Sequence, residues 1–303
     1  MIPTAKQLFL EINPRLAEHT AIRDVEEEKF FFTVCLSNGV YKRTCYDRLK
    51  DLDQLLIAEF QKLRVAPKAF LDVAVSSGVS TVQWFESLQQ AGLRPSMTAT
   101  DLTMTVYLVR LLSWLHVLVD KEGFPLQYDV FGLAWRPRSR IRFYVFGNGF
   151  LTTLWNVVCR VVARRYDLTN RLKSLQGNPP PIDDPVIKAR IKLVTWRLRN
   201  NKDIELLDDD ITQPTPPPLR GRFEVIRAAN ILNRGYFSVP QLRDAVINLR
   251  DRLAGPGTFL IVVCTEETGS NNGSVFRLGQ KGSFEVLTRV GKGSEIEDIV
   301  LSI

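Results

Sequence analysis

The stretch FLDVAVSSGVST, residues 70–81, carries the strongest indication of the fold. It begins as an apolar strand, reaches an acid at Asp72, and then runs through small residues that include one glycine, Gly78. An apolar pattern of helical spacing follows at Val82, Phe85 and Leu88. Small residues between a buried strand and a helix let backbone N–H groups approach a ligand, and the helix N-terminus favours a negative group. The stretch therefore predicts a ligand-binding turn in an α/β sheet.

This turn fits neither of the two familiar phosphate-binding motifs. A P-loop ends in Gly-Lys-Ser/Thr, and that ending is absent here. A dinucleotide-binding turn has the pattern Gly-x-Gly-x-x-Gly, and the corresponding positions hold Ala74, Ser76 and Val79. The glycine content is too low for either motif.

Strand and helix patterns alternate on both sides of the stretch. Apolar runs predict further strands at 97–101, 204–211, 222–232 and 258–264, and three short strand patterns near the C-terminus, the last at 297–303. Periodicity predicts helices at 4–12, 47–63, 105–114, 188–200 and 238–257, and the last of these has a capping box formed by Ser238 and Gln241. Hairpins are predicted at 29–44 and 116–131. This alternation favours an open, mostly parallel α/β sheet whose closing strands are antiparallel.

The composition sets limits on function. The chain has 303 residues, 45% of them apolar, which is enough for a globular core. Its four cysteines are scattered and it has only two histidines, so a zinc site is not expected. The scattered cysteines also predict a reducing, cytoplasmic setting. The N-terminus shows no signal-peptide pattern, and no long apolar run predicts a membrane span.

The net charge of +7 is concentrated in one segment. Residues 136–173 hold nine Lys/Arg and a single acid, Asp167. Four interpretations stay open: a solvated helical lid, an amphipathic helix on an anionic membrane surface, a patch for an acidic protein, and a contact for a nucleic-acid backbone. Aromatic residues interleave with the arginines and suit either a lipophilic pocket or base stacking. They are Phe143, Tyr144, Phe146 and Phe150.

The segment from Asp72 to Gly78 resembles the first motif of the Rossmann-like S-adenosylmethionine-dependent methyltransferases, acid-x-Gly-x-Gly-x-Gly. Alanine and serine replace its first two glycines. Asp101 matches the family's second motif, an acid that takes the ribose hydroxyls, and follows Asp72 at a normal strand-helix-strand distance. Backbone capping is the alternative role for both acids. From this resemblance we expect a cofactor site that includes Asp72, Val73, Ala74, Ser76, Gly78, Asp101 and Leu102.

Later segments extend the resemblance. Asp210 and Ile211 match the family's acid-apolar pair after the third strand, near the adenine. The segment RFEVIRAANILNRGYFS, 222–238, is similar to its fourth strand, which leads to active-site residues. The resemblance thus implies cofactor binding by Asp210, Ile211 and Asn230, and catalytic roles for Asn230, Asn233 and Tyr236. The final antiparallel strands also match. Together, the matching parts cover residues 67–112 and 185–303.

The sequence patterns predict an N-terminal, mostly helical cap with a hairpin at 1–66, and the resemblance implies a methyltransferase-like domain at 67–303. A basic and apolar lid at 113–184 is inserted between the second and third core strands. The expected function is methyl transfer from S-adenosylmethionine to a small, lipophilic or carrier-bound acceptor, in the cytoplasm or at a membrane surface. Two alternatives remain: an RNA methyltransferase using segment 136–173, and an inactive methyltransferase fold serving as a scaffold. The usual Asn/Asp-Pro-Pro-aromatic signature does not follow the fourth strand, which counts against methylation of a nucleobase amine.

Overall fold

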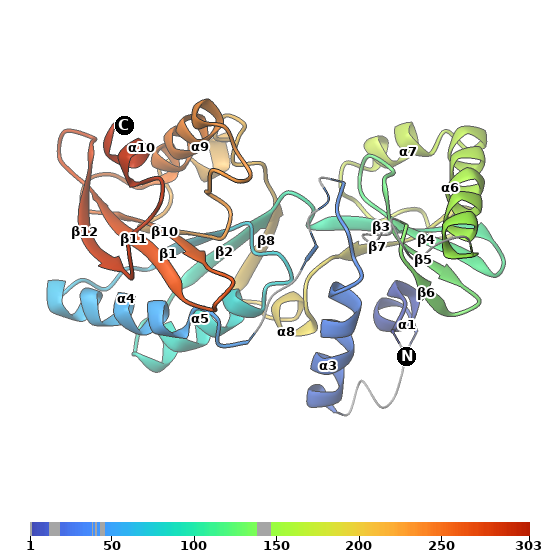
Figure 1. Cartoon of the computed structure of the whole chain (residues 1–303), viewed down its shortest axis with the longest axis horizontal. Helices are drawn as coiled ribbons and strands as arrows, with labels where there is room; N and C mark the ends of the chain where they lie inside the picture. The colour runs from blue at the N-terminus through green and yellow to red at the C-terminus, as the bar shows by residue number, and fades with distance from the viewer. Residues whose placement is uncertain (1, 12–18, 38, 40, 43–45, 138–146) are drawn as a thin grey trace. The chain divides into compact units, whose positions relative to one another are not determined.

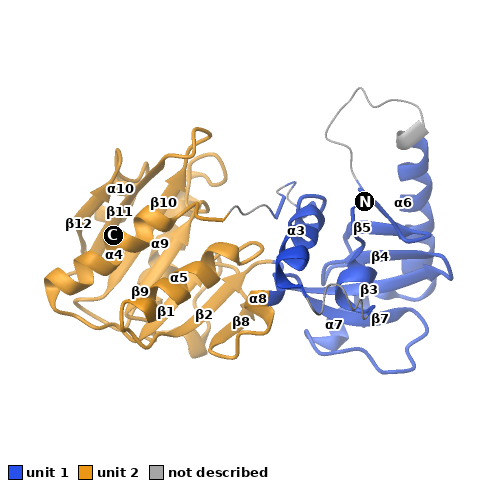
Figure 2. Cartoon of the chain, turned by 90° about the horizontal axis from the view of Figure 1, so that it is seen from below, with its two compact units in different colours: residues 1–43, 103–196 blue, residues 44–102, 197–303 orange. Residues whose placement is uncertain are grey.

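The computed structural model describes residues 2–11, 19–37, 39, 41–42, 46–137 and 147–303. The chain forms two compact units, shown in Figures 1 and 2. Unit 1 comprises Met1–Arg43 and Thr103–Trp196, and unit 2 comprises Thr44–Leu102 and Arg197–Ile303. The sequence predicted a boundary after residue 66 and an insertion at 113–184. In the structure, the helix at Lys50–Leu63 belongs to unit 2, and residues 103–112 and 185–196, on either side of that insertion, belong to unit 1.

Unit 2 is built on a seven-stranded sheet in the order β12-β11-β10-β9-β1-β2-β8. The five strands from β8 to β10 are parallel, and β11 and β12 are antiparallel additions at one edge. In chain order the parallel strands read 3-2-1-4-5, as in Rossmann-like sheets. The predicted Rossmann-like fold, mostly parallel with antiparallel closing strands, is confirmed. The strands are β1 (Ala69–Val73), β2 (Ser96–Asp101), β8 (Ile204–Asp208), β9 (Val225–Ala229), β10 (Phe259–Thr265), β11 (Asn271–Leu278) and β12 (Phe284–Val290).

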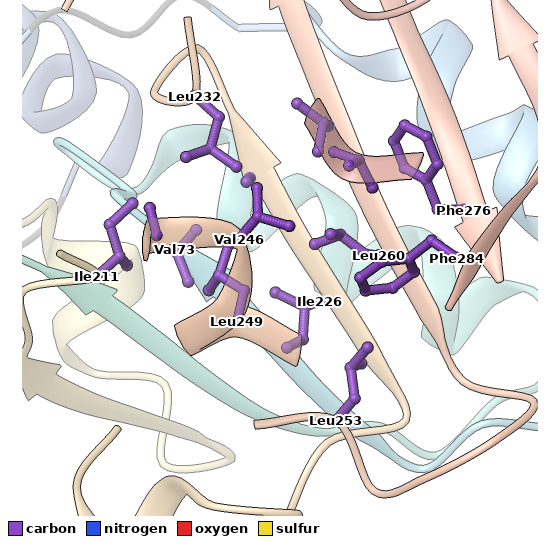
Figure 3. Packing of buried hydrophobic residues seen from close by; sticks show 14 of the residues in the cluster. Val73, Ile211, Ile226, Leu232, Val246, Leu249, Leu253, Leu260, Phe276 and Phe284 are labelled. Atoms are coloured by element: carbon purple, nitrogen blue, oxygen red, sulfur yellow. The ribbon is translucent and has the colours of Figure 1, made fainter. Parts of the chain in front are cut away.

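Helices cover both faces of this sheet. On one face, α4 (Lys50–Leu63) and α5 (Val79–Gln90) contact the strands through ring contacts of Phe60 and Trp84 with Phe70. On the other face lie α9 (Val239–Arg252) and α10 (Glu297–Leu301), above the core drawn in Figure 3. Odd and even residues of β1 therefore serve different layers, because successive strand side chains alternate between faces.

Helix α9 forms where its sequence signals predict it. The Gln241 side chain accepts a hydrogen bond from the Ser238 backbone N–H at 3.0 Å, which completes the helix N-terminus. Its inward face is fully buried against β9 and β10. The residues of that face are Leu242, Ala245, Val246 and Leu249.

Unit 1 contains a five-stranded sheet in the order β6-β5-β4-β3-β7, paired antiparallel throughout. Two separate groups of buried residues cover its faces, one shared with α1 and α3 and the other with α6 and α7. The strands are β3 (Thr105–Leu112), β4 (Leu115–Val119), β5 (Pro125–Val130), β6 (Leu133–Trp135) and β7 (Ile187–Lys192). The helices are α1 (Ala5–Phe9), α3 (Thr20–Phe31), α6 (Gly147–Arg165) and α7 (Leu168–Leu175). The hairpin predicted at 116–131 is present as β4 and β5, with Asp120 accepting hydrogen bonds from the turn N–H groups of Glu122 and Phe124.

Two predicted helices are wrong, and both lie in this sheet. Residues 105–112 form β3, which pairs with β4 on one side and β7 on the other. A strand in the middle of a sheet is apolar on both faces, so its periodicity cannot be told from that of a buried helix. Residues 188–200 contain β7 and the short helix α8 (Trp196–Arg199). In β7, Ile187 and Ile191 are buried and Arg190 is exposed, so the true pattern is that of a strand at the sheet edge.

Two other predictions are corrected near the termini. The strand expected at 297–303 is helix α10, since Ile296, Ile299 and Val300 are buried at helical spacing and two acids occupy the first turn. Of the hairpin expected at 29–44, residues 29–31 belong to α3, and an antiparallel bridge joins Cys35 to Tyr41 among the described residues; residues 38, 40, 43 and 44 lie outside them. Residues 138–146 of the basic segment, with Phe143, Tyr144 and Phe146, lie outside the described residues. Within the described chain, no helix is long and apolar enough to cross a bilayer.

Candidate functional site

The candidate site lies at the carboxyl ends of the parallel strands in unit 2. Asp101, the last residue of β2, is level with Asp208, the last residue of β8. The turn from Ala74 to Gly78 follows β1, and Asn230 follows β9. The chain departs in opposite directions from β1 and β9, which makes this the position where open α/β sheets bind ligands.

The turn after β1 has the backbone that glycines would favour, although glycine occupies only one position. Ala74, Ser76 and Gly78 have φ angles of 55°, 58° and 83°. All three lie in the left-handed region, which costs a residue with a Cβ about 1–2 kcal/mol. They are the three positions that the resemblance assigned to glycine. Left-handed residues at 74, 76 and 78 therefore alternate with residues of negative φ, although two of the three positions are not glycine.

Two hydrogen bonds fix the turn to the neighbouring strand, and a third closes the turn itself. The Val75 N–H donates to the Thr100 carbonyl at 3.1 Å, and the Gly78 N–H donates to the Val75 carbonyl at 2.9 Å. The Ser76 N–H donates to Asp101 Oδ2 at 2.8 Å. Asp101 is buried and joins the end of β2 to the turn after β1. The resemblance put both elements in one site, and the structure brings them into contact.

Helix α5 begins at this turn with Gly78 as its N-cap. No side chain caps its first turn, and the first N–H groups of any helix have no acceptor within the helix. The N-terminus of this 12-residue helix can therefore receive a negative ligand group. A side chain at Gly78 would displace Leu198, because its Cβ would clash with Leu198 Cδ2.

Ala74→Gly is expected to raise the free energy of unfolding by about 0.5–1 kcal/mol. The change relieves the left-handed strain, and the greater freedom of glycine in the unfolded chain offsets part of the gain. Urea unfolding measures the difference. The matched control is Ala91→Gly, at an α5 C-cap residue with a φ angle of −78°, where the same substitution is expected to destabilise. An Ala74→Gly protein no more stable than the wild type would contradict the account of the turn.

Asp72 faces the α4 and α5 layer and not the turn. Its Oδ1 and Oδ2 accept hydrogen bonds from Arg227 Nε and Nη2 at 3.0 and 2.7 Å, and Thr81 Oγ1 also donates to Oδ2 at 2.8 Å. Arg227 lies directly beside Asp72 in the neighbouring strand and reaches Asp53 of α4 at 2.9 Å. Its guanidinium also stacks 4.1 Å from the ring centroid of Trp84. We call this set the Arg227 cluster.

The Arg227 cluster makes stability depend on pH. Burial raises the pKa of Asp53 to about 7, with a further contribution from the charge of Asp72, although Arg227 acts in the opposite direction. A carboxyl whose pKa is higher in the folded state makes its full contribution to folding stability below its unfolded pKa of about 3.9. That contribution is lost as the pH rises toward the folded-state pKa of about 7. Stability should therefore fall across this window.

Asp53→Asn is expected to remove this fall, because an amide does not titrate. Each pH unit between the two pKa values corresponds to at most about 1.4 kcal/mol. Urea unfolding of both proteins at about pH 5 and about pH 8 tests the prediction. The variant should gain stability relative to the wild type at the higher pH. An equal difference at both pH values would show that Asp53 does not titrate in this way.

The acidic segment after β8 is occupied mainly by local contacts. Asp210 Oδ1 accepts hydrogen bonds from the backbone and hydroxyl of Thr212, at 2.9 and 2.7 Å. Ile211 is buried in the core. Asp209 pairs with the fully buried Arg252. These contacts hold the segment beside the end of β2, where the Asp209 N–H donates to the Asp101 carbonyl at 3.1 Å.

The three residues predicted as catalytic lie on the loop after β9. Asn230 has a φ angle of 60°, and its Oδ1 accepts from the Thr265 N–H at 2.6 Å, which fastens β9 to β10. Asn233 Oδ1 accepts from the N–H groups of Gly235 and Tyr236, both at 3.0 Å. The Tyr236 side chain is 54% exposed. Both asparagines thus shape the loop, and Tyr236 extends from it.

Sequence reasoning missed the Arg227 cluster. The available signal was an arginine inside the otherwise apolar strand segment EVIRAA. A charge in a buried strand needs a partner of opposite sign, and Asp72 in the adjacent strand was the obvious candidate. No sequence pattern indicated that Asp53 on α4 would complete the set.

A separate cavity of about 750 Å³ lies at the opposite end of the same sheet, around the amino ends of β2 and β8. None of the predicted site residues lines it. Its charged lining residues include Arg94, Lys202, Asp203, Glu205 and Arg222.

No protein family profile and no curated protein matches the sequence. Solved structures with a limited likeness include SAM-bound CalS10, an amino pentose methyltransferase from Micromonospora echinaspora, at 12% identity and a TM-score of 0.33 over 83% of this chain and 80% of that one. The N-methyltransferase NodS from Bradyrhizobium japonicum, in complex with S-adenosyl-L-homocysteine, has 13% identity and a TM-score of 0.31 over 73% and 64%. The CMeT domain of the citrinin polyketide synthase has 14% identity and a TM-score of 0.32 over 70% of this chain. This chain spans about a third (34%) of that last structure.

The class of protein is defined by the strand order and the turn. Unit 2 is a Rossmann-like α/β protein whose glycine-type turn and strand-end acid meet at the carboxyl edge of the sheet.

Proposed function

We propose that unit 2 binds S-adenosylmethionine at the turn of residues 74–79 and at Asp101, and that the chain is a methyltransferase for a small, lipophilic or carrier-bound acceptor. The observation that supports the proposal best is the backbone of the turn. Ala74, Ser76 and Gly78 all take the left-handed conformation, and the Ser76 N–H donates to Asp101. Because Ala74 and Ser76 keep this strained geometry without being glycine, the turn is still suited to ligand approach.

The residues of the site fit this cofactor chemically. The methionine carboxylate is a small anion and suits the uncapped N-terminus of α5. Ribose hydroxyls are donors, and Asp101 is an acceptor placed at a strand end beside the turn. Leu102 follows Asp101 directly and is 45% exposed, so it offers apolar surface for a planar base. Asp210 supplies a polar group near the same edge.

Within this proposal each group of residues has a distinct role. The turn and Asp101 bind and orient the cofactor, and the Arg227 cluster holds β1 against β9, with Asp72 as a positioning residue. Ile211 packs beneath the site from the core. Asn230 and Asn233 hold the loop after β9 in shape, and the exposed Tyr236 lies on the acceptor side.

S-adenosylmethionine held by the turn and Asp101 would supply an activated methyl group for in-line displacement. Alignment of the two reactants can provide most of the rate enhancement of such a step without a dedicated base. The placement of loop residues after β9 is therefore expected to matter more than their acidity.

Calorimetric titration of the full chain tests this function. We expect S-adenosylmethionine and S-adenosylhomocysteine to bind with micromolar affinity, and NAD to bind far more weakly because the turn lacks the dinucleotide pattern. Absence of binding by both sulfur ligands would favour the scaffold alternative, in which Ala74 and Ser76 have abolished the cofactor site. Tight NAD binding would refute the proposal.

A further inference from the structure

Helix α6 of unit 1 has two apolar faces, and among the described residues one packs on the sheet while the other is exposed. Its inner face contacts the sheet through Trp155, Val158, Cys159 and Val162. A second group of apolar side chains is exposed to solvent on the same helix. These are Phe150, Leu154, Val157 and Val161, with exposures of 70%, 39%, 47% and 59%.

The exposed group forms one continuous line. Its members are spaced by four, three and four residues, so they lie on one face of a helix with 3.6 residues per turn. At 1.5 Å per residue the line is about 16 Å long. A helix on the surface of a soluble unit normally has polar residues on its outer face, so this apolar line marks an interaction surface. We call it the outer stripe.

Positive charge lies beside the C-terminal end of the outer stripe. Arg160, Arg164 and Arg165 are all exposed, and α6 contains no aspartate or glutamate. At about 100° per residue, Arg164 and Arg165 lie about 50° to either side of the stripe near its end. The single acid between residues 147 and 175 is Asp167, whose carboxylate accepts hydrogen bonds from the Asn170 side chain. The surface therefore suits an anionic partner with an apolar layer beneath its charge.

We propose that the outer stripe of α6 binds the surface of an anionic lipid bilayer. The apolar line would enter the boundary between headgroups and acyl chains, while the guanidinium groups reach outward to the lipid phosphates. A single helix presents a ridge of side chains, and a protein partner would need a matching groove to bind it. A bilayer is deformable and needs no such groove, so the ridge favours a bilayer. The inference concerns unit 1 alone and does not depend on the proposed methyl transfer.

Vesicle co-sedimentation of the full chain tests the proposal. The two probes are phosphatidylcholine vesicles and vesicles of phosphatidylcholine mixed with phosphatidylglycerol. We expect binding to the mixed vesicles only. Arg164→Gln should weaken it roughly fivefold, since each basic residue near an anionic surface contributes about that factor. The matched control is Lys121→Gln, an exposed residue in the turn between β4 and β5 of the same unit, which should bind like the wild type.

A second variant, Phe150→Ser with Val157→Ser, tests the apolar part. Both side chains are exposed, so thermal unfolding should match the wild type while vesicle binding is lost. Vesicle binding unaffected by this variant would overturn the proposal. It would also be overturned if the wild type ignored both vesicles but formed a dimer in sedimentation velocity that the same variant dissociates, because the stripe would then belong to an interface with a second copy.

Discussion

Arg227→Met is expected to lower the free energy of unfolding by about 3–5 kcal/mol, the loss typical of a broken buried ion pair. The Arg227 side chain is 1% exposed and holds two carboxylates that are themselves 3% and 4% exposed. Methionine fills a similar volume but leaves Asp53 and Asp72 buried beside each other without a cation. Urea unfolding measures the loss.

The sheet provides a matched control for this variant. Arg277 also lies on a strand of unit 2, but its side chain is exposed. Arg277→Met should change stability by no more than about 0.5 kcal/mol. Equal effects of the two substitutions would contradict the assignment of Arg227 as the centre of the cluster.

A combined variant separates charge from packing. Asp53→Asn and Asp72→Asn, added to Arg227→Met, remove the two uncompensated charges and should recover part of the lost stability. Recovery would identify the buried charges as the main source of the loss. No recovery would show instead that Arg227 acts through its packing on Trp84.

Asp101→Asn is expected to weaken S-adenosylmethionine binding roughly 10- to 150-fold, the range for a lost hydrogen bond to a charged group. The amide oxygen of asparagine can still accept the hydrogen bond from the Ser76 N–H, so the turn should keep its shape. The amide N–H₂ group cannot accept from a ribose hydroxyl. Calorimetric titration measures the affinity, and urea unfolding checks that the variant is folded.

Asp244→Asn is the control for the loss of one negative charge, because Asp244 is an exposed residue of α9 in the same unit. It should bind the cofactor as the wild type does. If Asp101→Asn also bound with unchanged affinity, Asp101 would have only the turn-fixing role that its contact with Ser76 already gives it.

The core of unit 2 was predictable because its elements carry strong local signals. The β1 segment and β10 are apolar runs flanked by turn residues, and α9 combines a capping box with one apolar face. Unit 1 was harder, since β3 is buried on both faces and resembles a helix in sequence. The last element, α10, is so short that only the spacing of Ile296, Ile299 and Val300 distinguishes it from a strand.

The sequence predicted which segments form the candidate site but not how their side chains are oriented. The order of the motifs predicted that the turn, Asp101 and the loop after β9 lie at the same edge of the sheet, and in the structure each of them lies at the carboxyl end of a parallel strand. What sequence could not assign was the direction of each side chain. Asp72 points to the helix layer because Arg227 is its neighbour in register, and that register depends on the pairing of distant strands.

The most direct test of the central claim is to follow backbone amide resonances by NMR while S-adenosylhomocysteine is added. We expect shifts centred on the turn of residues 74–79 and on Asp101 and Leu102, and in Asp101→Asn the same shifts should need a roughly 10- to 150-fold higher ligand concentration. Shifts centred instead on the cavity near Arg94 and Lys202, or none at millimolar ligand, would contradict it.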